Sequence, residues 1–166
     1  MTVSYLCYDV TGRTAQEIRA AMNANPARPA DQGEKVDAFT RWESRLDWSY
    51  SGASGTCVTT SVTPALEITF TFPRWVSPLD PAPATIQRWG TYLDALQLHE
   101  NGHQQNGIDA TRDAVGRVKA VRTASCAEFN AAASQVMQAA LKVGNDADTR
   151  YDAVTRHGAT QGAVFP

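Results

Sequence analysis

The sequence has few of the residues that bind metals or form redox centres. Its 166 residues include three histidines and three cysteines. No two cysteines form a C-x-x-C pair, which excludes a thioredoxin-like motif and argues against thiolate zinc ligation. No apolar run approaches the roughly 18 residues needed to cross a bilayer, so we expect no transmembrane segment. The formal net charge is −2, with Lys and Arg scattered along the chain, and we therefore expect no nucleic-acid partner.

Length and composition indicate one domain over residues 1–166. A chain of about 150 residues hides roughly 70% of its unfolded surface on folding, so the core does not depend on a disulfide or a metal. Cys7 lies in the β-like run 4–8, which predicts a buried free cysteine. Cys57 and Cys126 are then the candidate disulfide pair, and such a bridge would imply an oxidising compartment.

The first half of the chain predicts strands and one short helix. The first ten residues predict a strand, and Thr14 followed by Glu17 is a capping box that predicts a helix to about Asn25. Residues 36–50 and 57–72 are rich in aromatic and β-branched residues and predict the two arms of a hairpin, with its turn at 51–55.

The second half predicts two long helices. Apolar residues between positions 84 and 121 fall on one helical stripe, and an alanine-rich helical pattern runs from about 126 towards 151. Strands followed by helices favour an α+β fold: N-terminal antiparallel strands with one helix, then two long helices.

The first long helix carries the motif His99-Glu100-Asn101-Gly102-His103, an H-E-x-x-H match. Histidines at i and i+4 lie on one helix face, one turn apart, so His99 and His103 can reach one zinc ion. Glu100 lies on a neighbouring face, where it can take the proton of a zinc-bound water. Two alternatives stay open. The histidines can simply be hydrogen-bonded in the interior with Glu100 in an ion pair, or the zinc can be structural, although structural sites usually include cysteine.

A catalytic zinc needs a third protein ligand. We predict His157, which lies in a Gly-flanked loop after the last helix and can be aimed inward. Asp109, six residues after His103, holds the third-ligand position of a metzincin-type pattern, although Asn106 stands where that pattern has glycine. Asp152, near the end of the last helix, is the other alternative.

Five segments together resemble a known family; they are residues 8–14, 40–42, 72–75, 99–103 and 151–158. They are similar to those of a bacterial domain family of unknown function that is described as predicted secreted zinc-dependent proteases. The resemblance implies a zincin-like domain and supports His157 as a site residue. Cys57 and Cys126 resemble the family's paired cysteines. Members usually carry a signal peptide, so the implied export to the periplasm or the exterior applies to this chain as a mature form.

These observations predict a small secreted or periplasmic zinc metallopeptidase that acts on a peptide or protein substrate. His99, His103 and His157 would hold zinc, and Glu100 would activate the zinc-bound water. Tyr151 is predicted to donate a hydrogen bond to the oxyanion of a tetrahedral intermediate, and a half-buried packing role is its alternative. The alternative function is a zincin-derived module that binds zinc and contacts cell-envelope proteins without substantial peptidase activity.

Overall fold

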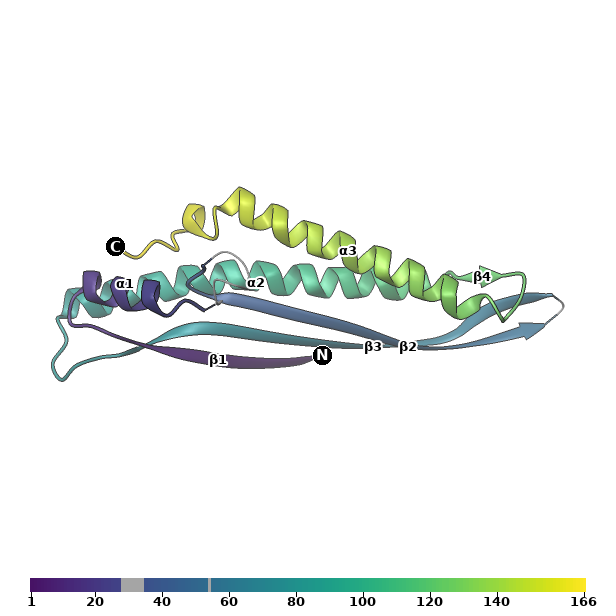
Figure 1. The fold of residues 1–166 in the computed structure, drawn as a ribbon, viewed down its shortest axis with the longest axis horizontal. Helices are drawn as coiled ribbons and strands as arrows, with labels where there is room; N and C mark the ends of the chain where they lie inside the picture. Colours follow the sequence, from purple (N-terminus) through teal and green to yellow (C-terminus); the bar gives the residue numbers. More distant parts are fainter. Residues whose placement is uncertain (28–34, 54) are drawn as a thin grey trace. The chain divides into compact units, whose positions relative to one another are not determined.

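The computed structural model describes residues 1–27, 35–53 and 55–166 and has a mixed α+β fold (Figure 1). Its elements in chain order are β1 (Thr2–Thr11), α1 (Ala15–Ala24), β2 (Phe39–Ala53), β3 (Thr56–Val76), α2 (Pro83–Lys119), β4 (Arg122–Thr123), α3 (Phe129–Thr155) and the 3-10 helix η2 (Ala159–Gln161). The predicted α+β class and the progression from strands to two long helices are confirmed. Ser54, in the predicted hairpin turn, lies outside the described residues.

Two predictions about the helices can be checked directly. The capping box is present: the Thr14 hydroxyl accepts from the Glu17 backbone N–H at 3.2 Å, and the Glu17 carboxylate accepts from the Thr14 backbone N–H at 3.3 Å. α2 is 37 residues long and α3 is 27, but within the described part of the chain no helix combines the length and hydrophobicity of a membrane span.

The chain divides into two compact units, which are described separately. Unit 1 comprises residues 1–2, 42–68 and 105–149, and unit 2 comprises residues 3–41, 69–104 and 150–166. Each unit has its own apolar core. The assignment of residues 1–166 to a single domain stays a prediction.

In unit 1, a disulfide joins β3 to the segment before α3. Cys57 and Cys126 form this bridge, as predicted. β4 pairs antiparallel with the start of β3, placing Cys57 opposite Thr123 and Val58 opposite Arg122. The core beside the bridge includes a stacked pair of Tyr50 and Phe129, with ring centroids 4.4 Å apart. The bridge therefore fixes the end of the hairpin to the start of α3.

Reduction of this disulfide, or the double variant Cys57→Ala/Cys126→Ala, is expected to lower the free energy of unfolding by about 4 kcal/mol. The cysteines are 69 residues apart, and cross-linking them removes loop-closure entropy from the unfolded chain. Denaturant titration measures the change. Cys7→Ser is the matched control, because Cys7 is exposed and outside the disulfide. Equal stability of the oxidised and reduced proteins would contradict the expectation.

In unit 2, β1 runs in the same direction as β3. Three side-chain contacts advance together along both strands: Ser4 with Thr69 at 2.9 Å, Tyr5 with Phe70 at 5.1 Å between ring centroids, and Asp9 with Arg74 at 2.6 Å. The expectation that the N-terminal strands are all antiparallel is therefore wrong for β1. The strand order is β1-β3-β2, and α1 and β2 provide the long connection that a parallel pair requires.

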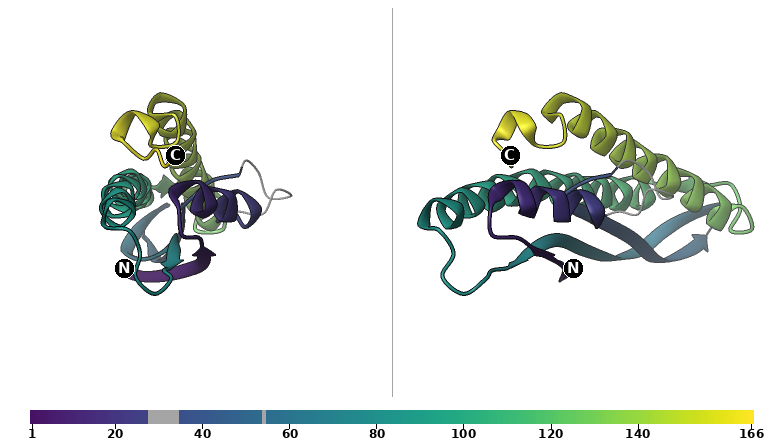
Figure 2. Two further views of the ribbon diagram at one scale, coloured as in Figure 1. Left: turned by 90° about the vertical axis from the view of Figure 1, so that its left-hand side faces the viewer. Right: turned by 60° about the vertical axis from the view of Figure 1, so that its left-hand side comes forward.

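α1 and the first part of α2 lie on the same face of the sheet in unit 2 (Figures 1 and 2). Their apolar sides meet in one core, which includes Ile18, Met22, Trp89, Tyr92, Leu96 and Phe165. The prediction that Cys7 is buried is wrong, because Cys7 is exposed on β1. β1 stands at the end of the strand order, and most of its side chains are exposed.

A polar network in unit 2 holds the segment that leads into β2. Both carboxylate oxygens of Asp37 accept from Arg19, at 2.7 and 2.8 Å, and one also accepts from the Tyr92 hydroxyl at 2.6 Å. The Tyr8 hydroxyl donates to the Asp37 carbonyl at 2.7 Å. Burial raises the pKa of Tyr92 far above its ordinary value, so this hydroxyl stays protonated and donates. The network fixes the chain three residues before Thr40.

Candidate metal centre

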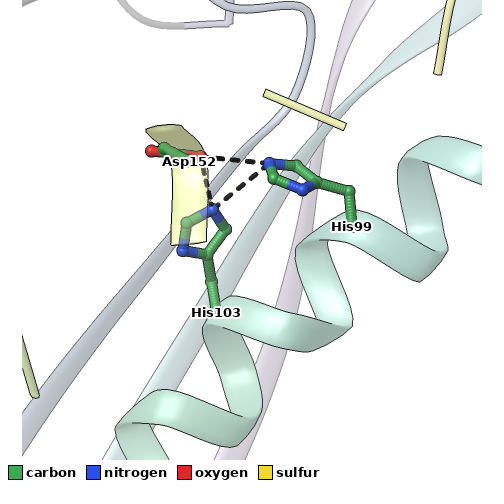
Figure 3. Close-up of side chains that lie close together, drawn as sticks. All are labelled: His99, His103 and Asp152. Carbon is green, nitrogen blue, oxygen red and sulfur yellow. Dashed lines mark hydrogen bonds and ion pairs between the residues drawn. The ribbon is translucent and has the colours of Figure 1, made fainter. Parts of the chain in front are cut away.

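Two histidines of α2 and one aspartate of α3 converge in unit 2 (Figure 3). Asp152 Oδ1 lies 3.1 Å from Nε2 of His99 and 3.1 Å from Nε2 of His103. The two Nε2 atoms are 3.3 Å apart. Both histidines are buried and Asp152 is partly buried. The i, i+4 spacing on α2 therefore presents two nitrogens to one point, and α3 supplies an oxygen.

The spacing of these three atoms fits a small cation. Ligand atoms at the usual zinc distances of about 2.0–2.2 Å, arranged tetrahedrally, lie about 3.3–3.6 Å from one another. The observed separations of 3.1–3.3 Å are close to this. A carboxylate offers only lone pairs, so each ring nitrogen this close to it must either donate an N–H to the carboxylate or share a metal ion with it. The group of His99, His103 and Asp152 can therefore hold a metal ion.

The electrostatics of Asp152 favour its charged form. Burial acts to raise the pKa of Asp152, but hydrogen bonds from His103 and His99, together with the positive charge of neighbouring histidines, outweigh it. Its pKa therefore lies well below the ordinary value. A carboxylate that stays ionised near two imidazoles is suited to bind a cation.

Glu100 lies in the same unit, almost completely buried at 3% exposure. Its Oε2 accepts a 2.6 Å hydrogen bond from the Thr40 hydroxyl on β2. Burial raises the pKa of Glu100, while the Thr40 bond and the charges of His103 and His99 oppose the rise. No local pattern in the sequence pairs Thr40 with Glu100, because they are 60 residues apart. A buried carboxyl with a raised pKa is typical of a general acid or base.

Tyr151 packs against both histidines of the motif. Its ring is nearly parallel to that of His99, with centroids 5.0 Å apart, and meets the His103 ring edge-on at 5.1 Å. The Tyr151 hydroxyl donates to the His99 carbonyl at 3.2 Å and accepts from the Gln161 amide at 3.0 Å. These ring contacts and hydrogen bonds hold the Tyr151 side chain in place. Its predicted contact with an oxyanion stays a prediction.

Gly102, inside the motif, makes room for this tyrosine. A Cβ placed on Gly102 would overlap the ring and hydroxyl of Tyr151. Gly90, in the same helix, has open space at the corresponding position, with no atom within 4 Å. The absence of a side chain at residue 102 is therefore needed for α3 to bring Tyr151 against the motif.

Gly102→Ala is expected to destabilise the protein by about 1–3 kcal/mol, because the methyl group must displace Tyr151. It is also expected to weaken metal binding, since Tyr151 supports the His99 ring. Gly90→Ala is the matched control and should stabilise α2 by roughly 0.5–1 kcal/mol. Denaturant titration of the two variants measures the difference, and effects of the same sign would refute this explanation.

His157 lies beside Asp152. Its Nδ1 is 3.3 Å from Asp152 Oδ1, and its side chain is 41% exposed. Arg156 and His157 both have φ of 51°, in the left-handed region that residues with a side chain seldom adopt, and Gly158 continues this turn with φ of 82°. Such strain is most frequent at functional sites. The group of three atoms contains Asp152 rather than His157, and the assignment of His157 as a zinc ligand stays a prediction.

Asp109 is outside this group. α2 continues without a break past Asn106, and Asp109 is exposed on it. Its carboxylate accepts from Gln105 at 3.0 Å and from Arg112 at 2.7 Å, which are contacts within one helix. Asp109 is therefore bonded to neighbouring surface residues of α2. It does not join the histidines as the metzincin-type pattern predicts.

Gln161 is a site residue that the sequence analysis missed. Its Oε1 lies 3.0 Å from Nδ1 of His99. η2 carries it, and this short helix is flanked by Gly158 and Gly162, both with left-handed φ. No local pattern singles out Gln161, because its partner is 62 residues away.

Residues 5–158 match the model of a family described as a bacterial protein of unknown function (DUF922). The chain belongs to the DUF922 family. The match covers both motif histidines, Glu100 and Asp152, and it confirms the resemblance to a bacterial family of unknown function. Comparison with curated proteins and with solved structures found no match. The DUF922 description names no activity, so the protease assignment and the zincin-like fold stay predictions.

Proposed function

We propose that this DUF922 protein is a zinc-dependent hydrolase, and specifically a small metallopeptidase of the zincin type. One observation carries the proposal. Three potential ligand atoms of His99, His103 and Asp152 lie 3.1–3.3 Å apart, and the helix that carries both histidines, α2, also carries the buried carboxyl group of Glu100.

The set of donors favours zinc. Two imidazole nitrogens and one carboxylate oxygen are typical zinc ligands, and three protein ligands leave one position for water or substrate. A structural zinc site usually closes all four positions and draws on cysteine, whereas two of the three cysteines here form a disulfide elsewhere. The open position therefore favours a catalytic role over a structural one.

In this proposal Glu100 is the general base. When bound, zinc polarises a carbonyl group and lowers the pKa of water towards about 7. Thr40 engages Oε2 of Glu100, which orients the carboxylate, and we assign proton transfer to Oε1. Burial raises the pKa of Glu100 towards the range in which a carboxylate accepts and returns a proton efficiently.

We further propose that the protein works outside the cytoplasm. The disulfide between Cys57 and Cys126 supports this, because such bridges form and persist in oxidising compartments. A periplasmic or secreted location is consistent with a peptidase that acts on peptides or proteins of the cell envelope.

A second candidate is a zinc-binding module that contacts cell-envelope proteins without substantial hydrolysis. The burial of the motif favours it: His99, Glu100 and His103 expose 3%, 3% and 8% of their surface. A substrate would have to approach from the side of Asp152, whose side chain is 25% exposed.

Metal analysis and a peptide assay test both candidates. Protein purified without chelator is expected to contain about one zinc per chain, and its absence after zinc is supplied would refute both. Incubation of the zinc-loaded protein with a broad peptide library then separates them. Cleavage that stops when a chelator removes zinc supports the peptidase, and zinc binding with no cleavage at all supports the binding module.

A further inference from the structure

Both ring nitrogens of His99 have polar neighbours. Its Nε2 faces Asp152 and His103, and its Nδ1 faces the side-chain amide of Gln161, with Oε1 at 3.0 Å. The other end of the same amide, Nε2 of Gln161, donates to the Tyr151 hydroxyl at 3.0 Å. That hydroxyl donates to the main-chain carbonyl of His99 at 3.2 Å. One amide therefore links the His99 ring to the tyrosine that packs on it.

The direction of these hydrogen bonds determines which ring nitrogen carries the proton. A neutral imidazole has one N–H and one lone pair. If Oε1 of Gln161 accepts from Nδ1, the proton of a neutral His99 is on Nδ1, and the lone pair of Nε2 is available for a metal ion that replaces the hydrogen bond to Asp152. If the amide is reversed, its N–H₂ donates to Nδ1 and Nε2 must carry the proton, which prevents Nε2 from binding a metal.

We propose that Gln161 is a positioning residue that holds His99 in the tautomer able to bind zinc. This inference rests on the proposed zinc site and adds a residue to it. A partner on the far nitrogen of a histidine ligand commonly fixes its tautomer and raises its basicity. Thr155 is a weaker substitute, because its hydroxyl lies 3.5 Å from Nδ1 and donates to the Tyr151 carbonyl at 2.7 Å.

The placement of Gln161 is built into the backbone. η2 follows directly on the left-handed turn at the end of α3, and glycine bounds it on both sides, with φ of 82° at Gly158 and 95° at Gly162. Gly158 also approaches the His99 side chain, where a Cβ would lie 3.0 Å from the ring. The turn thus brings η2 against the edge of the His99 ring that carries Nδ1, and the metal group lies at Nε2.

Zinc affinity of four variants tests the inference, measured by competition with a chromophoric chelator. Gln161→Leu removes the acceptor and should weaken zinc binding about 10–100-fold. Gln161→Glu keeps an acceptor and loses the donor, so it should bind zinc at least as tightly as the wild type. Tyr151→Phe keeps the ring and removes the hydroxyl, and it should change affinity much less than Gln161→Leu. Gln97→Leu, at a partly exposed glutamine of α2 that donates to Asn101, is the matched control and should have no effect.

The outcomes separate this inference from the proposed function. If wild-type protein does not bind zinc, the proposed function fails and the role of Gln161 fails with it. If the wild type binds zinc and Gln161→Leu binds equally well, only the role of Gln161 is refuted. Gln161→Glu gives an independent result should the leucine variant not fold, because a tenfold loss of affinity in a folded glutamate variant would also refute it. In zinc-loaded wild type, ¹⁵N NMR should show the proton of His99 on Nδ1, and a proton on Nε2 would overturn the inference.

Discussion

Asp152→Ala is expected to abolish tight zinc binding, with a loss of more than about 100-fold in affinity. Asp152 supplies the only oxygen in the group of three, so its removal leaves two imidazoles as protein ligands. Changes to the partners of ligands already cost about 10–100-fold, and loss of a ligand itself should cost more. Competition titration with a chelator measures the affinity. Circular dichroism of the variant verifies that it folds.

His157→Ala is the decisive comparison. The contact of His157 with Asp152, at 3.3 Å, predicts a loss of about tenfold if His157 only supports the aspartate. If instead His157→Ala abolishes binding while Asp152→Ala keeps it, His157 is the third ligand and the assignment from geometry is wrong. Asp109→Ala should leave the affinity unchanged, because its partners are Gln105 and Arg112 on the surface of α2.

Glu100→Gln is expected to lower the rate of peptide hydrolysis by about 10²–10⁴-fold while zinc stays bound. Glutamine matches the shape of glutamate, and its amide oxygen can still accept from Thr40, but it cannot take a proton at neutral pH. The measurement compares kcat/KM of wild type and variant on a peptide found in the library screen. Zinc content is determined on the same samples.

The matched control is Glu128→Gln, which makes the same change at an exposed position. It should leave hydrolysis unchanged. Full activity of Glu100→Gln would show that another group is the base and that Glu100 is buried for structural reasons. Loss of zinc together with activity would show that Glu100 acts on the stability of the site rather than on proton transfer.

The parts of the site that the sequence predicted are local ones. The convergence of His99 and His103 follows from helix geometry, because residues at i and i+4 face the same side whatever surrounds the helix. The capping box at Thr14 and Glu17 is local in the same sense. The pairing of Cys57 with Cys126 is different, because 69 residues separate them and no local pattern joins them. That prediction rests on elimination and on the resemblance to the family.

The parts that the sequence could not rank depend on contacts between distant segments. Asp152 was one of three candidates for the third ligand, and it lies 49 residues from His103. Which residue near the end of α3 reaches the histidines depends on how α3 packs on α2, and the close approach of Tyr151 to Gly102 is part of that packing. The direction of β1 was missed for a similar reason, because a strand pattern does not reveal whether its neighbour is parallel or antiparallel.

The contact between Gly102 and Tyr151 has a consequence for how DUF922 sequences can vary. Position 102 is one of the two unspecified positions of H-E-x-x-H, yet here a side chain at that position would occupy the space of the Tyr151 ring. The two residues should therefore change together. Members of the family with a larger residue at the position of Gly102 should carry a smaller one at the position of Tyr151, and the histidine that Tyr151 covers would then need another neighbour.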